Sequence, residues 1–245
     1  MQIHIVDDAD QLGLQAARAS AALLNEVIAE QGQARVALST GASQFEFLKH
    51  FVTMDVPWDK VVMFHLDEYI GLSEQHPASF RNYLKERFLQ HVGVTDYLLV
   101  DGEGDPAAVI ARLNEAIAAA PVDLALIGIG ENGHIAFNDP PADFDDPAPY
   151  RIVDLTDTCK QQQVNEGWFP SLQEVPRQAI TMTVSQIMRC RRIISCVPHQ
   201  AKAAAIANTL EKEISPHYPS TILKRHDDWS LYLDKASSSK IAVWA

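Results

Sequence analysis

Residues 123–141 contain the side chains of this chain that are best suited to proton transfer. The segment opens with a short apolar run over residues 124–129, which is typical of a buried parallel strand. A glycine-rich loop follows and carries Asn132, His134 and Asp139. Ligands of open α/β sheets bind at the carboxyl ends of strands, and a histidine beside a carboxylate can exchange protons near neutral pH. The segment therefore predicts an acid–base site; taken alone, a tight turn with a hydrogen-bonded histidine is the alternative.

Two adjacent carboxylates, Asp67 and Glu68, follow a second apolar strand, predicted over residues 61–66. Acidic residues are uncommon at the end of a buried strand, because burying a carboxylate costs free energy unless the group has a binding partner or a catalytic function. Successive side chains of an extended segment point to opposite sides. One acid can therefore face a ligand while the other holds the loop. A solvated start of a loop is the competing interpretation of this pair.

Anion binding is indicated by the sequence Ser-Thr-Gly-Ala-Ser at residues 39–43, here named the 39–43 turn, which joins a predicted strand to a predicted helix. Hydroxyls and free backbone N–H groups at the start of a helix can hold an anion, although plain N-capping explains the same residues. Neither a Walker A motif nor a GxGxxG fingerprint is present, so nucleotide binding is not supported.

Lys202 is a further candidate, because it lies in the first turn of a helix predicted over residues 200–211. A cation is unfavourable there for the helix dipole, and a nearby anion would explain it; a surface lysine is the alternative. All four clusters follow predicted strands, whose carboxyl ends share one edge of a sheet. This convergence favours a phosphorylated small molecule held by the 39–43 turn and Lys202, with Asp67 and His134 at the reacting end.

The elements that must position these residues alternate between strand and helix. Strands are predicted over residues 2–6, 35–38, 61–66, 97–100, 124–129, 151–155, 192–197, 229–233 and 241–244. Helices are predicted over residues 9–31, 44–51, 79–90, 106–120, 180–189 and 200–211, and residues 139–149 are predicted to form a loop. This order predicts an α/β protein with a Rossmann-like, doubly wound, mostly parallel sheet flanked by helices. A single domain over residues 1–245 is expected.

Composition excludes several classes of function. The 245 residues carry a net charge of −12 without a basic stripe, so a nucleic-acid partner is not expected. No apolar stretch approaches a membrane span. The absence of HxH and HExxH spacing predicts no metal site. The three cysteines form no CxxC pair, and no signal peptide is visible, which predicts a reducing, cytoplasmic setting.

The chain resembles the glucosamine-6-phosphate deaminase family over almost its whole length. The matching segments are Ser-Thr-Gly at 39–41, LDEYIGL at 66–72, HPAS at 76–79, GENGHIAFN at 130–138, ITMT at 180–183 and Lys-Ala at 202–203. The related 6-phosphogluconolactonases have a different sequence after the Asp-Glu pair and a GHxAS-type loop. The resemblance therefore implies deamination and isomerisation of an amino-sugar 6-phosphate, without a cofactor, by a protein acting alone or as a homo-oligomer.

The resemblance also implies a role for each matching residue. Asp67 corresponds to the base that moves a proton between carbons 2 and 1 of the opened sugar. His134 corresponds to the acid that opens the ring, supported by Asn132 and Asp139. The residues implied in binding substrate and phosphate are Ser39, Thr40, Gly41, Ser43, Gly133 and Lys202.

Three positions depart from the family pattern. Asp139 is one methylene shorter than the usual Glu, and Asn132 cannot carry a charge. The family's phosphate-binding arginine is missing after residues 156–158, where Lys160 and Gln161–Gln163 stand instead. If Lys160 and Gln161–Gln163 take over that part of the site, phosphate is held more by neutral hydrogen bonds and less by charge, without the bidentate geometry of arginine.

Two other functions remain as alternatives to glucosamine 6-phosphate deamination. One is another enzyme of the same fold, a galactosamine-6-phosphate deaminase or a sugar-phosphate lactonase. The second is a sugar-phosphate sensor domain of a transcription regulator, which would carry a helix-turn-helix segment ahead of the fold. Because the first strand is predicted at residue 2, the sensor is disfavoured.

Overall fold

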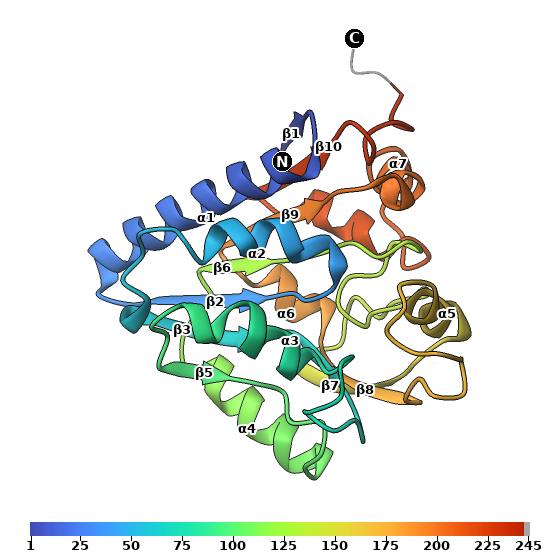
Figure 1. Ribbon diagram of the computed structural model, residues 1–245, viewed down its shortest axis with the longest axis horizontal. Helices are drawn as coiled ribbons and strands as arrows, with labels where there is room; N and C mark the ends of the chain where they lie inside the picture. Colours follow the sequence, from blue (N-terminus) through green and yellow to red (C-terminus); the bar gives the residue numbers. More distant parts are fainter. Residues whose placement is uncertain (243–245) are drawn as a thin grey trace.

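A seven-stranded sheet in which every pairing is parallel forms the centre of the computed structural model, which describes residues 1–242 (Figure 1). Its strands, in spatial order, are β1 (Gln2–Val6), β10 (Trp229–Asp234), β9 (Arg192–Val197), β6 (Leu124–Leu126), β2 (Ala34–Leu38), β3 (Val61–His65) and β5 (Asp96–Leu98). The predicted α/β class and mostly parallel sheet are confirmed.

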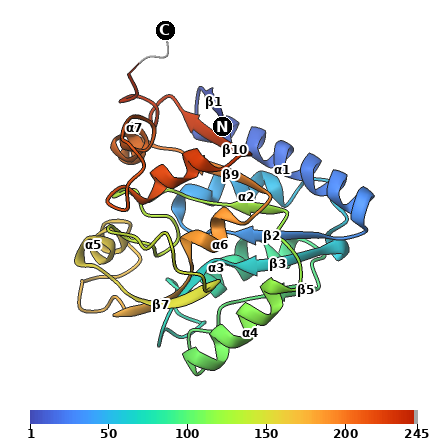
Figure 2. The same cartoon turned by 180° about the vertical axis from the view of Figure 1, so that it is seen from behind.

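Helices cover both faces of this sheet (Figures 1 and 2). One face packs against α1 (Ala9–Gln31), α2 (Phe45–Phe51) and α3 (Phe80–Arg87), and the other against α4 (Pro106–Ala118), α6 (Val184–Met188) and α7 (Ala203–Glu211). The strands serve both faces because their side chains alternate. In β2, Val36 and Leu38 join the first core, whereas Ala37 joins the second.

Helix α1 has the predicted bounds because both of its ends are marked in the sequence. The Asp8 carboxylate accepts a hydrogen bond from the Gln11 N–H (2.8 Å), which caps the start. Gly32 adopts the left-handed conformation (φ 79°) that ends the helix. Gly13 lets α2 approach closely, since a Cβ there would lie 2.5 Å from the Glu46 carbonyl carbon.

A second, antiparallel sheet was not predicted. It consists of β4 (Asp67–Tyr69), β8 (Gln178–Met182) and β7 (Tyr150–Asp154), in that order. The helix predicted over residues 180–189 is therefore wrong in its first part, because residues 180–182 belong to β8, where Ile180 and Thr181 pair with both neighbouring strands. Thr183 then caps the short α6 through the Gln186 N–H (3.2 Å).

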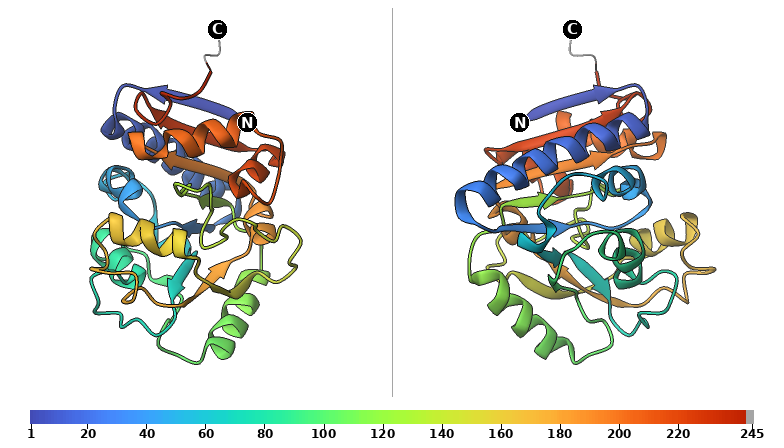
Figure 3. Two further views of the ribbon diagram at one scale, coloured as in Figure 1. Left: turned by 90° about the vertical axis from the view of Figure 1, so that its right-hand side faces the viewer. Right: turned by 60° about the vertical axis from the view of Figure 1, so that its left-hand side comes forward.

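Helix α5 (Asp157–Asn165) was also not predicted, and it lies beyond the carboxyl ends of β2 and β3 (Figures 1 and 3). It starts at Thr156, whose hydroxyl accepts a hydrogen bond from the Cys159 N–H (3.2 Å). A third apolar cluster joins α5 to the second sheet and includes Tyr69, Phe80, Phe137 and Cys159. The second sheet and α5 together build one wall over the edge where a ligand would enter.

Short 3₁₀ segments complete the elements, at Ala42–Gln44 (η1), Trp58–Lys60 (η2), Leu89–His91 (η3), Gln200–Lys202 (η4) and Pro219–Arg225 (η5). The strand predicted over residues 241–244 is not formed at residues 241–242, and the rest of it lies outside the described residues. Within residues 1–242, no helix is both long and apolar enough to cross a membrane.

Candidate active site

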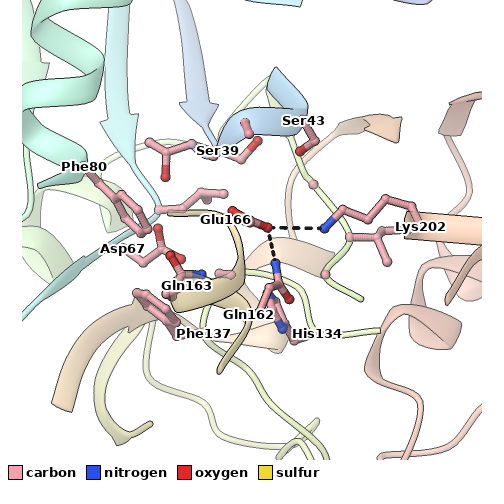
Figure 4. Close-up of a pocket in the computed structure, with 18 residues that line it drawn as sticks. Ser39, Ser43, Asp67, Phe80, His134, Phe137, Gln162, Gln163, Glu166 and Lys202 are labelled. Carbon is pink, nitrogen blue, oxygen red and sulfur yellow. Dashed lines mark hydrogen bonds and ion pairs between the residues drawn. The ribbon is translucent and has the colours of Figure 1, made fainter. Parts of the chain in front are cut away.

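A pocket of about 600 Å³, its open mouth included, lies at the carboxyl ends of the central strands (Figure 4). Seven of the residues predicted for the site line it: Ser39, Thr40, Gly41, Ser43, Asp67, His134 and Lys202. They come from segments that follow β2, β3, β6 and β9. The shared sheet edge therefore brings together all four clusters found in the sequence.

His134 is oriented from behind by Asn132 and Asp139, neither of which lines the pocket. Its Nδ1 lies 2.7 Å from Asn132 Oδ1 and 3.3 Å from Asp139 Oδ1. The Asn132 amide points its oxygen at the ring because its Nδ2 donates to Asp139 Oδ1 (2.9 Å). With two acceptors facing it, Nδ1 carries a proton, and Nε2 is left to act on a ligand.

Asp139 is held as a carboxylate. Burial raises the pKa of Asp139, but the hydrogen bond and charge of His134, with donors from Asn132 and Thr156, outweigh burial and bring it to about 2. The Thr156 hydroxyl donates to Oδ2 over 2.7 Å. The shorter acid at this position therefore still reaches the histidine.

Two glycines of the histidine loop differ in what they do. A Cβ on Gly130 would lie 2.2–2.4 Å from the His134 ring, so the imidazole rests directly on that glycine. Gly133, predicted to bind substrate, does not line the pocket. Its N–H donates to Gly130 O (3.0 Å) and its carbonyl accepts from the Ser220 N–H (2.8 Å), so both backbone groups serve the turn.

Asp67 and Glu68 face opposite ways from β4, as an extended backbone dictates. Asp67 lines the pocket although it is only 6% exposed, and its carboxylate accepts no hydrogen bond from residues 1–242. Burial, reinforced by the charge of Glu68, raises the pKa of Asp67 to about 8. A carboxyl group in that range can both take and return a proton near neutral pH.

Glu68 ties β4 to the start of α3. Its carboxylate accepts hydrogen bonds from the Ser79 hydroxyl (2.8 Å), the Arg81 N–H (2.8 Å) and Arg81 Nε (3.3 Å). Burial raises the pKa of Glu68, and these donors oppose the rise. Its role is to position the loop beneath Asp67.

The opposite end of the pocket offers donors to an anion. The Ser39 hydroxyl is buried and has no partner among the described residues. Gly41 takes a left-handed φ of 102°, and Tyr83 holds the turn by donating to its carbonyl (2.9 Å). Lys202, the last residue of η4, also points into the pocket (Figure 4). Burial lowers the pKa of Lys202, and the charges of Glu166 and Glu131 oppose that shift.

Helix α5 supplies Gln162 and Gln163, two of the glutamines that stand where the arginine is missing, and Glu166, which the sequence did not single out, lies just beyond its end. Lys160 is the other residue that the sequence offers in place of the arginine. It does not line the pocket, and its Nζ lies 3.9 Å from Asp157. Helical spacing from Gln162 to Glu166 would have revealed the shared face, had a helix been predicted here.

The fold and the pocket define an α/β enzyme that handles a small anionic molecule by acid–base chemistry. Residues 7–231 match the model of a family described as glucosamine-6-phosphate isomerases/6-phosphogluconolactonase. The chain belongs to that family, which confirms the resemblance seen in the motifs.

Individual relatives carry the deaminase name. The chain is 36% identical over 218 residues to the glucosamine-6-phosphate deaminase of Streptococcus sanguinis (strain SK36), covering 89% of this chain and 91% of the relative. It is 32% identical over 240 residues to that of Lactobacillus delbrueckii subsp. bulgaricus (strain ATCC BAA-365 / Lb-18), covering 98% and 99%.

Solved structures show the same arrangement. A monomeric glucosamine-6-phosphate deaminase of the NagB superfamily superposes with a TM-score of 0.89 at 29% identity, over 98% of this chain and all of the other. A putative 6-phosphogluconolactonase from Neisseria gonorrhoeae (FA 1090) reaches 0.76 at 19% identity, over 96% and 99%. At that identity the likeness shows the fold alone.

Proposed function

We propose that this protein converts glucosamine 6-phosphate and water into fructose 6-phosphate and ammonia, without a cofactor. The observation that carries the proposal is Asp67, a buried carboxylate that faces the pocket and accepts no hydrogen bond from residues 1–242. Such a group is suited to removing a proton from carbon. Because the related lactonases also carry the Asp-Glu pair, the choice of deamination over lactone hydrolysis rests on relatives named glucosamine-6-phosphate deaminase at 32% and 36% identity.

Each proton transfer of the proposed reaction is assigned to one residue. His134 Nε2 protonates the ring oxygen and opens the pyranose. Asp67 takes the proton from carbon 2 of the open aldehyde, which gives an enolamine, and returns a proton to carbon 1. The product is an imine at carbon 2, and water hydrolyses it to the ketone and ammonia. Asn132 and Asp139 act through His134 by holding its ring.

Substrate identity is tested by measuring ammonia release from a panel of amino sugars. We expect the highest kcat/KM with glucosamine 6-phosphate and a lower value with the galactosamine epimer. Activity confined to galactosamine 6-phosphate would replace the proposed substrate with its epimer.

Lys202→Ala is expected to raise KM about tenfold or more. The reason is that a charge-assisted hydrogen bond contributes roughly 1.5–3 kcal/mol, and Lys202 is the lysine that lines the pocket. Lys160→Ala is the matched control and should change KM much less, because its side chain lies outside the pocket lining. Equal effects of the two substitutions would refute the assignment.

Gly130→Ala is expected to lower kcat by about tenfold or more, because the new methyl group would displace the His134 ring on which catalysis depends. Gly93→Ala serves as the control, since nothing lies within 4 Å of a Cβ at that position. Both variants are compared by steady-state kinetics and thermal melting. Wild-type kcat in a folded Gly130→Ala enzyme would show that the ring position is not critical.

The setting of the enzyme is part of the same proposal. We place it in the cytoplasm, since Cys159, Cys190 and Cys196 are free, buried thiols. Its binding partner is the sugar phosphate. If the protein forms a homo-oligomer, a second copy of the chain is also a partner.

A further inference from the structure

The Glu166 carboxylate stands at the anion-binding end of the pocket (Figure 4). Its Oε1 accepts a hydrogen bond from Gln162 Nε2 (2.8 Å), and its Oε2 accepts one from Trp168 Nε1 (3.1 Å). The side chain is 20% exposed. Two neutral donors thus fix the Glu166 carboxylate at the position where the proposed function places the substrate phosphate.

Lys202 faces this carboxylate without being hydrogen-bonded to it. Its Nζ lies 4.0 Å from Glu166 Oε1, its side chain is 9% exposed, and it donates no hydrogen bond to any residue from 1 to 242. Across the same pocket, the buried Ser39 hydroxyl is also without a partner in that range. Lys202 is ion-paired with Glu166 but keeps its N–H donors for an anion, and the seat that it offers adjoins Glu166.

Charge balance at this seat opposes a doubly charged anion. Apart from His134, Lys202 is the one basic side chain among the described residues that line the pocket, and Glu166 compensates it. A phosphate monoester is mostly a dianion at neutral pH, since its second pKa is about 6. A dianion on Lys202 would meet the Glu166 carboxylate at close range. A phosphate that keeps one proton would instead donate an O–H···O⁻ hydrogen bond to it, which is a strong kind of contact.

We propose that Glu166 makes this subsite selective for the singly protonated phosphate, so that the substrate binds together with one proton. The proton comes from solvent and lies between a phosphate oxygen and Glu166. This inference rests on the proposed function, which places the phosphate against Lys202. The other titratable groups around Glu166 and the pocket are Lys202, Glu131, Tyr69, Cys159, Asp67 and His134.

Calorimetric titration with glucose 6-phosphate, which carries the phosphate but no amine, tests the proposal. At pH 7.5, in buffers of different ionisation enthalpy, the wild-type protein should take up close to one proton for each ligand bound. Glu166→Gln should abolish most of that uptake and bind more tightly than wild type at pH 8. Glu131→Gln, which removes a neighbouring carboxylate outside the pocket lining, should keep the uptake.

Three results would overturn the proposal: no proton uptake by the wild type, uptake unchanged in Glu166→Gln, or no binding of glucose 6-phosphate. Persistent uptake in Glu166→Gln would come from Asp67 or His134. Ammonia release from glucosamine 6-phosphate, measured on the same wild-type sample, reports on the proposed function separately. Ammonia release with uptake unaffected by Glu166→Gln removes this inference and leaves the deaminase.

Discussion

Asp67→Asn is expected to lower kcat by about 100-fold or more while leaving the binding of glucose 6-phosphate largely intact. Loss of a general base costs on the order of 10²–10⁴-fold, and asparagine cannot accept the proton from carbon 2. The amide is close in size to the carboxylate that it replaces, so the pocket keeps its shape. Steady-state kinetics and calorimetry on the same preparation measure the two effects.

The pH dependence of wild-type activity and stability follows from the raised pKa of Asp67. Because burial and Glu68 raise the pKa of Asp67 to about 8, the ionised base is scarce at low pH, and kcat at saturating substrate should rise as the pH approaches 8. The folded protein holds this proton more tightly than the unfolded chain, so stability falls as the pH rises from about 4 through 8. Asp67→Asn removes that penalty and should melt no lower than wild type at pH 8.

Two results would contradict the assignment of Asp67. Near-wild-type turnover by Asp67→Asn would show that another group takes the proton. Loss of ligand binding in step with turnover would show that Asp67 serves binding instead of catalysis.

Glu68→Gln is expected to destabilise the protein by about 3–5 kcal/mol, the cost of breaking a buried ion pair from one side. Glu68 is fully buried, and the change removes the one buried carboxylate that pairs with Arg81 among the described residues, at 3.3 Å, and leaves the guanidinium only the half-exposed Asp101 and Glu103. Chemical denaturation measures the free energy of unfolding.

Glu103→Gln is the matched control for that measurement. Glu103 also pairs with Arg81, at 3.1 Å, but its side chain is 49% exposed. Exposed pairs contribute about 0–1 kcal/mol. If the two substitutions destabilise the protein equally, Glu68 does not anchor β4 to α3 as described.

The parallel sheet and most of its helices could be predicted, because their signals are local. Apolar or alternating stretches of four to six residues indicated the strands, and the Asp8 cap and Gly32 indicated both ends of α1. The antiparallel sheet could not be predicted, because β4 has only three residues and they pair with residues more than a hundred positions away in the sequence. Asp67, for example, pairs with Thr181. Residues 180–189 form a short segment of mixed apolar and polar side chains that fits either a strand or a helix.

The residues of the candidate site also fall into some that could be predicted from the sequence and some that could not. Asp67, His134 and the 39–43 turn stand at strand ends and could be found from their residue types. Gln162 and Gln163 could be found only from the position of the missing arginine. Glu166 could not be found, because α5 has a largely polar sequence that buries only Cys159 and Gln163 and shows no apolar stripe. The missing arginine was visible in the sequence. The Glu166 carboxylate faces Lys202 in a site that lacks this arginine, and it could be recognised only from the position of α5 over the pocket.

The most direct test of the proposed function is the stoichiometry of the products formed from glucosamine 6-phosphate. The purified protein should release ammonia and fructose 6-phosphate in equal amounts, and Asp67→Asn should release neither at an appreciable rate. Hydrolysis of 6-phosphogluconolactone with no ammonia from glucosamine 6-phosphate would contradict the account, because the protein would then be a lactone hydrolase and Asp67 would not act as a base toward carbon 2.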